Sequence, residues 1–460
     1  MKKIKLLIFA FVLILKTFAQ SNFSEDSIVN KFRIDTLFSN FLNENRFIKI
    51  WLPSEYPKEK KYPVFFVLDE DWMFEPVMLN VKQLINANVI PPSIVVGVHS
   101  NNRSKDLRLG VDGSFTESSF LFYKFINEEL FTYLGKTITQ TAFPILIGHS
   151  DGAVFAQKIL VQPNQKFRAI LCLSPQLAEG QFEEIKHFVE SKFDNTYFHF
   201  IASGLKDGGR RLKSTMKLDS LFQTIKNPSV KLETKIYKID HFAVGLVALT
   251  DGISFVFNDF IEENDWNNSY LDSLRTLNVN PVDYIKDYQA KINKIYNIDV
   301  KPRKEGVLSV ANVLVKNKKQ LQEYFDYETL LYGKDKYYNT SIAQNLERLN
   351  EFEEALKYWK LNLMDSTAAN DLFFYYSRPI ELIANRMYNP KKAIEFAEEW
   401  QKKKPKFNLQ FNYAIAKICA TKNIELNKGK VAIKYCVDNY KTNGTFTLAN
   451  AKDLELKLAK

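Results

Sequence analysis

Three side chains of this sequence have the types and the chain order that nucleophilic catalysis requires: Ser150, Asp207 and His241. Ser150 lies in the pentapeptide GHSDG (148–152), which joins the apolar run FPILI to the helix-like segment AVFAQKILVQ. A serine at a tight strand-to-helix turn projects its hydroxyl out of the sheet, and the flanking glycines leave room for the turn. The pattern predicts a serine nucleophile for acyl chemistry, against the alternative of a glycine-rich turn with an incidental serine.

A serine hydroxyl needs a base that removes its proton, and the base needs an acid that orients it. Asp207 follows the strand-like run 197–202 in the loop SGLKDGG, and His241 follows the run 232–239. Catalytic groups gather beyond the carboxyl ends of strands in α/β sheets, and the order Ser, Asp, His is that of α/β-hydrolases. We therefore predict that His241 is the base and Asp207 its orienting acid.

Other residues compete for these two roles. Asp194 and Asp240 are the alternative acids, and a buried structural histidine is the alternative interpretation of His241. We expect the side chain of His149 to point away from Ser150, because it lies inside the turn. The remaining histidines are weaker candidates, since they precede the serine or lie in a helix or mid-strand: His99, His187 and His199.

The oxyanion that develops during acyl transfer needs two hydrogen-bond donors. The backbone N–H of Asp151, next to the nucleophile at the start of a helix, is expected to be the first donor. The second is expected from the loop 69–72 after the apolar run 64–68, with the N–H of Asp71 or Trp72 as the candidates.

The elements that must position these groups are short apolar runs alternating with helix-like stretches. Runs rich in Val, Ile, Leu and Phe are typical of strands covered on both faces, and their alternation with helices predicts a mostly parallel sheet flanked by helices. The early runs, joined through the polar segment SEYPKEKK, indicate antiparallel strands. We assign residues 22–262 to an α/β-hydrolase fold. The clearest runs are 47–52, 64–68, 94–98, 145–147, 169–173, 197–202 and 232–239.

Residues 263–460 have a different pattern, with few glycines and with Lys, Glu, Leu and Tyr at helical spacing. The tetrapeptides ALKY (355–358), AIEF (393–396) and AIKY (432–435) recur at a nearly constant interval. In each, a small alanine allows close approach of two helices and an aromatic residue follows three positions later. We predict an all-α domain of tetratricopeptide-like helical repeats, with an irregular helical bundle as the alternative.

The first residues form a separate segment. Lys2, Lys3 and Lys5 precede an apolar run at 6–15, and a small residue follows at Ala19. This pattern predicts a cleaved signal peptide at 1–19 and export to the periplasm or the exterior, with no stable membrane span after cleavage. An uncleaved anchor is the alternative, because Lys16 interrupts the end of the run.

Composition excludes several classes of protein. Hydrophobic residues make up 46% and charged residues 25%, which is ordinary for a globular protein. The net charge of +10 falls to 10 − 4 = +6 without the four leader lysines, and the remaining lysines are dispersed, so we expect no nucleic-acid partner. No metal-binding cluster or nucleotide loop is evident, so we expect no cofactor. We expect the three cysteines to be free buried thiols, with pairing of Cys419 and Cys436 as the alternative.

Six ordered segments of residues 28–262 together resemble the putative-esterase family that includes esterase D and enterochelin-esterase-like proteins. These are NRFIKIWLPSEY, KYPVFFVLDED, PPSIVVGVHSNNRSKDLRL, FPILIGHSDGA, ILCLSPQL and IASGLKDGG. The resemblance implies the triad Ser150, Asp207 and His241 and an oxyanion hole shaped by the loop 69–72. It also implies that Arg103 and Asp106 brace the loop beside the site. Substrates of the family are carboxylic esters and thioesters, including siderophore and sugar esters.

Three positions depart from the family pattern: Glu70 replaces a usual glycine, Asp151 follows the nucleophile, and Ala153 replaces a frequent glycine. A carboxylate at Asp151 disfavours a nearby oxyanion unless it points away.

The leading hypothesis is an exported serine carboxylic ester hydrolase acting on a small-molecule, carbohydrate or siderophore ester. One alternative is a non-catalytic scaffold whose helical repeats dock a protein partner. Another is acyl transfer or peptide hydrolysis by the same triad.

Overall fold

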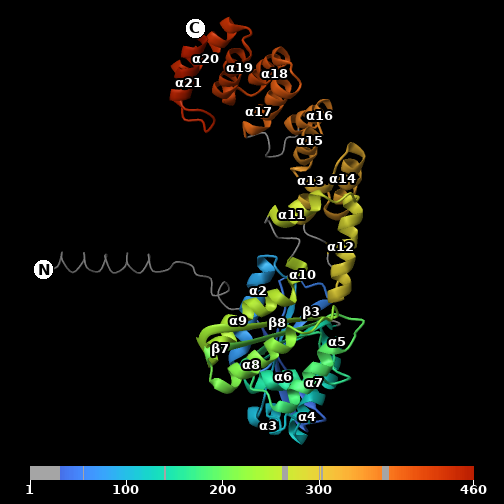
Figure 1. Ribbon diagram of the computed structural model, residues 1–460. Helices are drawn as coiled ribbons and strands as arrows, with labels where there is room; N and C mark the ends of the chain where they lie inside the picture. The colour runs from blue at the N-terminus through green and yellow to red at the C-terminus, as the bar shows by residue number, and fades with distance from the viewer. Residues whose placement is uncertain are drawn as a thin grey trace, which may run out of the picture. The chain divides into compact units, whose positions relative to one another are not determined.

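The computed structural model describes residues 32–54, 56–138, 141–261, 268–299, 301, 304–364 and 372–459 (Figure 1). The predicted signal peptide at 1–19 and the predicted domain boundary at residue 262 lie outside these residues. The chain forms two compact units. The first contains residues up to Asp265 together with Ala290–Val300, and the second contains Trp266–Gln289 and Lys301–Lys460.

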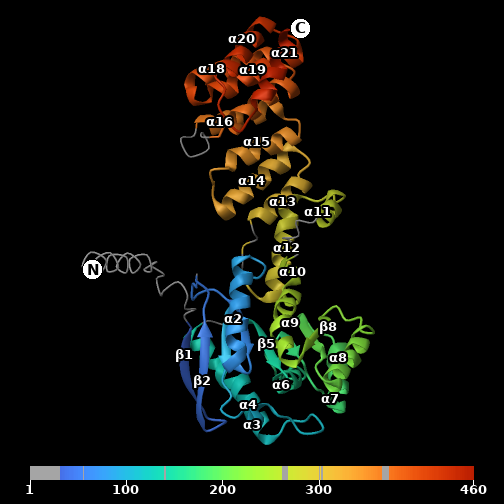
Figure 2. The same cartoon turned by 90° about the vertical axis from the view of Figure 1, so that its left-hand side faces the viewer.

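The first unit is built on an eight-stranded sheet with the strand order β1-β2-β4-β3-β5-β6-β7-β8. β1 pairs with β2, and β2 with β4, in antiparallel orientation, whereas every pair from β4 to β8 is parallel. Figure 2 shows β1 and β2 side by side at one edge of the sheet. The predicted parallel sheet with early antiparallel strands is therefore confirmed. The strands are β1 (Arg33–Ser39), β2 (Glu44–Trp51), β3 (Tyr62–Val67), β4 (Ile94–Val98), β5 (Thr141–His149), β6 (Ala169–Leu173), β7 (Tyr197–Lys206) and β8 (Val230–Asp240).

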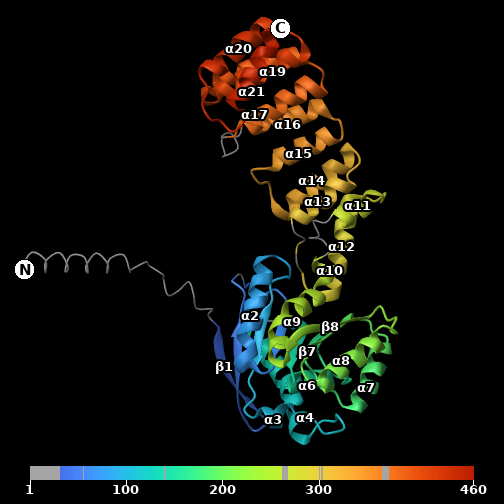
Figure 3. The same cartoon turned by 60° about the vertical axis from the view of Figure 1, so that its left-hand side comes forward.

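Helices cover both faces of this sheet, which explains why β3, β4 and β6 are apolar and buried at every position. On one face lie α2 (Glu70–Asn86) and α9 (His241–Val256), which also contact each other. Gly252 allows α9 to approach the sheet, because an added Cβ would lie 2.8 Å from a methyl carbon of Leu171. The other face carries the shorter helices and the π-helical segment η2 (Figure 3). These are α3 (Arg103–Leu107), α4 (Glu117–Lys124), η2 (Phe125–Leu130), α5 (Phe131–Thr137), α6 (Asp151–Leu160), α7 (Glu179–Glu190) and α8 (Gly209–Phe222).

A later segment of the chain also belongs to the first unit. Helix α10 (Asn258–Ile261) follows α9, and residues from Ala290 onward, in the second half of α12 (Pro281–Tyr296), pack on the first unit. The Tyr296 hydroxyl donates to the Val256 carbonyl at 2.9 Å.

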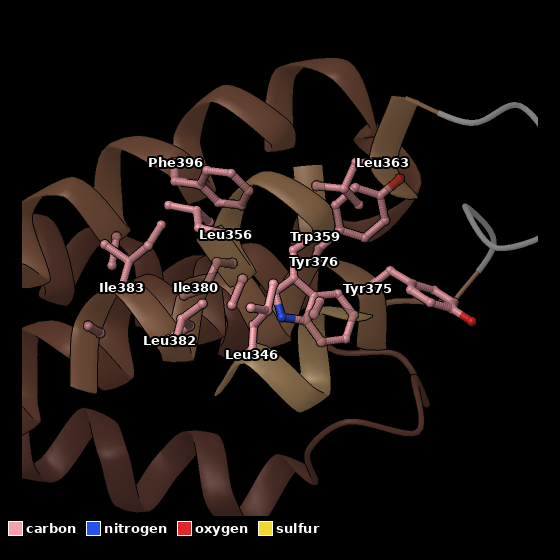
Figure 4. Packing of buried hydrophobic residues seen from close by; sticks show 14 of the residues in the cluster. Leu346, Leu356, Trp359, Leu363, Tyr375, Tyr376, Ile380, Leu382, Ile383 and Phe396 are labelled. Carbon is pink, nitrogen blue, oxygen red and sulfur yellow. The ribbon is translucent and has the colours of Figure 1, made fainter. Parts of the chain in front are cut away.

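The second unit consists of helices in the part of the chain that the structure describes, as the sequence predicts. Its core is one apolar cluster, and Figure 4 shows a part of it in which the rings of Trp359 and Tyr376 pack between helices. Besides α12, the described helices of this unit are α11 (Asn268–Arg275), α13 (Lys304–Leu314), α14 (Lys318–Tyr332), α15 (Tyr338–Arg348), α16 (Phe352–Met364), α17 (Phe374–Glu381), η5 (Leu382–Arg386), α18 (Pro390–Lys403), η6 (Pro405–Phe407), α19 (Asn408–Lys422), α20 (Leu426–Asp438) and α21 (Leu448–Ala459).

The three recurring tetrapeptides lie in α16, α18 and α20, each of which packs against the helix before it. Ala355, Ala393 and Ala432 are all buried, as close approach of two helices requires. The aromatic residues differ, since Phe396 is buried whereas Tyr435 is partly exposed. The likeness to tetratricopeptide repeats stays a prediction.

Two further findings concern the whole described chain. Cys172, Cys419 and Cys436 are buried free thiols. Among the described residues, no helix combines the length and the apolar character needed to cross a membrane.

Candidate active site

The predicted nucleophile lies at a strained turn. Ser150 connects β5 directly to α6 and has φ 58° and ψ −120°, a conformation that non-glycine residues rarely adopt. Its N–H donates to the Leu173 carbonyl at 2.9 Å, which ties the turn to the neighbouring strand β6. Gly148 is required here, because an added Cβ would lie 2.2 Å from the Gly152 carbonyl oxygen. This geometry matches the strand-turn-helix context that the sequence predicts for a serine nucleophile.

Asp207 and His241 lie together beyond the carboxyl ends of β7 and β8. The His241 Nδ1 is 2.6 Å from Asp207 Oδ1, the carboxylate is fully buried, and the imidazole is partly exposed. The alternative acids do not take this place. Asp240 caps α9 by accepting from the Ala243 N–H at 3.0 Å, and Asp194 is exposed before the opposite end of β7.

Ser150 lies beside this pair. The ring of His149, the residue before it, is 4.5 Å from the His241 ring between centroids. Among the described side chains, Arg211 is the hydrogen-bond partner of the Ser150 hydroxyl, with Nη2 at 3.4 Å from Oγ, and His241 forms no hydrogen bond with Oγ. Serine–base hydrogen bonds are often long in unliganded sites and tighten when substrate binds. The catalytic roles of these residues stay predictions.

Ser174 is a residue of the site that the sequence analysis missed. It follows β6, is completely buried and has φ 61°. Its hydroxyl donates to Asp207 Oδ2, and its Oγ lies 2.8 Å from His241 Nδ1. Ser174 thus contacts both members of the acid–base pair. The available signal was a polar residue directly after a buried strand, at the edge of the sheet where catalytic groups gather.

His149 has a supporting position. Its Nε2–H donates to the His241 carbonyl at 2.8 Å, and its ring packs edge-on against Trp72. Burial lowers the pKa of His149 to about 4, so this imidazole is neutral at physiological pH. His149 therefore fixes the start of α9, which carries His241.

The two candidates for the second oxyanion donor differ in their backbone contacts. Helix α2 begins after Asp69, which has the left-handed conformation φ 55°, ψ 47°. The Trp72 N–H already donates to the Asp69 carbonyl at 3.3 Å, and its indole ring packs on His149. Asp71 lies in the first helical turn, where backbone N–H groups have no acceptor within the helix, and so does Asp151 in α6. Asp71 is therefore the better candidate of the two.

The carboxylate of Asp151, which is unfavourable for a nearby oxyanion, forms an ion pair with Arg103. Arg103 Nη1 donates to Asp151 Oδ2 at 3.1 Å. The same guanidinium binds both oxygens of Asp69, at 2.6 Å and 3.0 Å, and its Nη2 donates to the His149 carbonyl at 3.3 Å. The hydrogen bond with Asp69 raises the pKa of Arg103, so the cation persists at all physiological pH values. Burial nevertheless raises the pKa of Asp69.

Glu70 and Asp106 also have cationic partners. Glu70 is buried and binds Lys49 Nζ at 2.5 Å and His99 Nδ1 at 2.7 Å, so both of its oxygens are engaged by cationic or donor groups. Asp106 binds Arg46 through two hydrogen bonds, of 2.6 Å and 3.1 Å. Arg103 and Asp106 thus brace the region through different partners.

The fold and the Ser–His–Asp constellation define an α/β-hydrolase with a candidate serine-hydrolase site. Residues 39–196 match the model of the family described as putative esterase. This match supports a hydrolase that acts on carboxylic esters.

The chain is similar to several solved structures, and the first of those described below has the same fold. An uncharacterised protein from Capnocytophaga ochracea DSM 7271 matches with a TM-score of 0.61 and 18% identity, over 77% of this chain and 100% of that chain. An IroE-like serine hydrolase from Shewanella oneidensis has a TM-score of 0.49 and 20% identity, over 69% of this chain and 99% of its own. The siderophore hydrolase EstB from Aspergillus nidulans has a TM-score of 0.41 and 16% identity, over 49% of this chain and 94% of its own. A search of curated proteins found no match.

Proposed function

We propose that this chain is an exported serine esterase that hydrolyses a small-molecule carboxylic ester through an acyl-enzyme intermediate. The single observation that carries the proposal is the contact of buried Asp207 with His241 beside the strained turn of Ser150. The match of residues 39–196 to the putative-esterase family model supports the reaction class.

The path of the proton follows from which nitrogen of the His241 ring is free to accept it. Because Nδ1 of His241 is bound by Asp207, the imidazole accepts the Ser150 proton at Nε2 as Oγ attacks the ester carbonyl. The backbone N–H groups of Asp151 and Asp71 are the proposed donors to the oxyanion. The alcohol leaves with the proton from Nε2, and an acyl-serine remains. Water then attacks the acyl group and gives one proton to Nε2. The acyl–Oγ bond breaks, Nε2 returns this proton to Oγ, and the acid leaves with the other proton of the water.

A fluorophosphonate probe and p-nitrophenyl acyl esters test this function. Wild-type protein is expected to react with the probe and to hydrolyse the esters, and Ser150→Ala is expected to do neither. Ser220→Ala, an exposed serine on α8, is the matched control and should behave as wild type. A folded wild-type protein that neither reacts nor hydrolyses any ester contradicts the proposal.

Export is the part of the proposal that rests on residues 1–19. Their basic, apolar and small-residue order is typical of a signal peptide. Expression of the full chain in a bacterial host, followed by N-terminal sequencing of the protein from the periplasm and medium, tests it. A full-length protein confined to the cytoplasm contradicts export.

Docking of a protein partner by the second unit is a second candidate function. A groove between α17 and α19 combines apolar and polar side chains, as an interaction surface does. Its lining includes Phe373, Ile380, Glu381, Gln410, Tyr413 and Lys417. Loss of a partner in a pulldown with Tyr413→Ala, together with absent ester turnover in wild type, would favour this function over the esterase.

A further inference from the structure

Arg211 is a cation in contact with the predicted nucleophile. It is the third residue of α8, four positions after Asp207, so the connection from β7 to α8 carries both residues. Its Nη2 donates to Ser150 Oγ at 3.4 Å. Any ester bound for attack by Ser150 must therefore lie against this guanidinium.

Unlike Arg103, Arg211 has no anionic partner among the described residues. Arg103 is satisfied by Asp69 and Asp151. Within the described part of the chain, Arg211 forms no ion pair, and its Nε is buried without a hydrogen-bond partner. A half-buried guanidinium with an unsatisfied donor is unfavourable, and a carboxylate ligand would satisfy it through paired hydrogen bonds.

The acids near the nucleophile are already bound and do not compete for Arg211. The Asp207 carboxylate is held by His241 and Ser174, and the Asp151 carboxylate by Arg103. The free positive charge at the nucleophile is thus available to a substrate.

We propose that Arg211 is the anion-binding residue of this site and that the substrate is an ester with a carboxylate close to the scissile carbonyl. This inference rests on the proposed esterase function. A bound carbonyl carbon lies about 3 Å from Oγ, and a carboxylate oxygen about 2.8 Å from a guanidinium nitrogen. With Nη2 at 3.4 Å from Oγ, these distances place the carboxylate only a few bonds from the carbonyl. Hemiesters of dicarboxylic acids and esters of hydroxy acids belong to this class.

Two pairs of esters of similar shape test the charge preference. p-Nitrophenyl hemisuccinate and p-nitrophenyl 4-methylpentanoate differ in the charge of the acyl group, and 4-acetoxybenzoate and 4-methylphenyl acetate differ in the charge of the alcohol. Arg211→Met is expected to lower kcat/KM for the anionic member of at least one pair by roughly 10- to 100-fold, as loss of a charge-assisted hydrogen bond predicts. The neutral members should change by less than about threefold, because they lose no such bond.

Matched variants separate this role from others. Arg210→Met removes an exposed neighbouring arginine. In neither ester pair should it change the ratio of kcat/KM for the anionic member to kcat/KM for the neutral member. Arg211→Lys should retain part of the preference, since it keeps the charge without the planar fork. If Arg211→Met lowers kcat/KM equally for anionic and neutral esters, the inference is overturned, because such a loss indicates a structural or oxyanion-binding role. An unchanged kcat/KM for both kinds of ester also overturns it. Thermal unfolding and fluorophosphonate labelling report on the fold and nucleophile of each variant. Wild-type protein without labelling or turnover refutes the esterase function and this inference with it.

Discussion

Replacement of Ser174 by alanine should impair catalysis although Ser174 is not the nucleophile. Its hydroxyl donates to Asp207 Oδ2, while Oδ1 of the same carboxylate binds His241 Nδ1 at 2.6 Å. Among the described residues, the other donor to Oδ2 is the Gly204 N–H at 3.5 Å, at the limit of a hydrogen bond. Without Ser174 the carboxylate loses the contact that fixes its orientation toward the imidazole.

The size of the effect follows from the type of bond. A hydrogen bond to a charged group contributes about 1.5–3 kcal/mol, which corresponds to a loss of roughly 10- to 100-fold in rate. We expect the loss mainly in kcat, because the Asp–His pair stabilises the imidazolium that forms only during reaction. The free energy of unfolding should fall by about 1–3 kcal/mol, since a buried carboxylate oxygen loses its donor.

Steady-state kinetics on a p-nitrophenyl ester and urea unfolding measure both quantities. Ser174→Gly is the matched control, because glycine lacks the hydroxyl but accepts φ 61° without strain. It should lose as much activity as Ser174→Ala and less stability. In ¹H NMR, the downfield signal of the His241 Nδ1 proton should shift or broaden in both variants. A folded Ser174→Ala protein with kcat within about twofold of wild type refutes the reasoning.

Three further predictions concern the surroundings of the site and the core. Asp151→Asn should leave kcat/KM within about threefold of wild type, because the ion pair with Arg103 already holds this carboxylate. Arg103→Met should lower the free energy of unfolding by roughly 3 kcal/mol, because it leaves buried Asp69 unpaired. Kinetics and urea titration check both, and a large gain of activity in Asp151→Asn would contradict the role of the ion pair. Burial lowers the pKa of His199 to about 3, below its unfolded value near 6.5, so the neutral ring stabilises the fold above pH 6.5 and this stability is lost as the pH falls toward 3. His199→Leu should therefore gain roughly 2 kcal/mol more in unfolding free energy at pH 5 than at pH 8, and an equal change at both values would refute the assignment. Gly148→Ala should abolish ester turnover and fluorophosphonate labelling, because its Cβ would meet a backbone oxygen at 2.2 Å; a labelled, active variant would show that the turn can relax.

Local patterns in the sequence were sufficient for the sheet and for three positions of the site. The apolar runs of β3, β4 and β6 predict strands covered on both faces, and in the structure these strands are buried at every position. The turn at Ser150 was predictable because glycines, a strand and a helix adjoin it along the chain. Asp207 and His241 were expected together because both follow strands of one parallel sheet, whose carboxyl ends share an edge.

The contacts that decide how these groups work depended on the tertiary structure. Ser174 is 33 residues from Asp207, and Arg103 is 48 residues from Asp151, so no spacing along the chain relates them. The strand order brings β6 between β5 and β7, and the turns that follow these strands then place Ser174 against the acid and the base. The direction of each side chain determines its role in the site. Asp151 could have faced an oxyanion, but it pairs with Arg103, and Arg211 could have pointed to solvent, but it points to Ser150. A sequence specifies which groups are present at the edge of the sheet, whereas packing across distant segments determines which of them meet and with what charge.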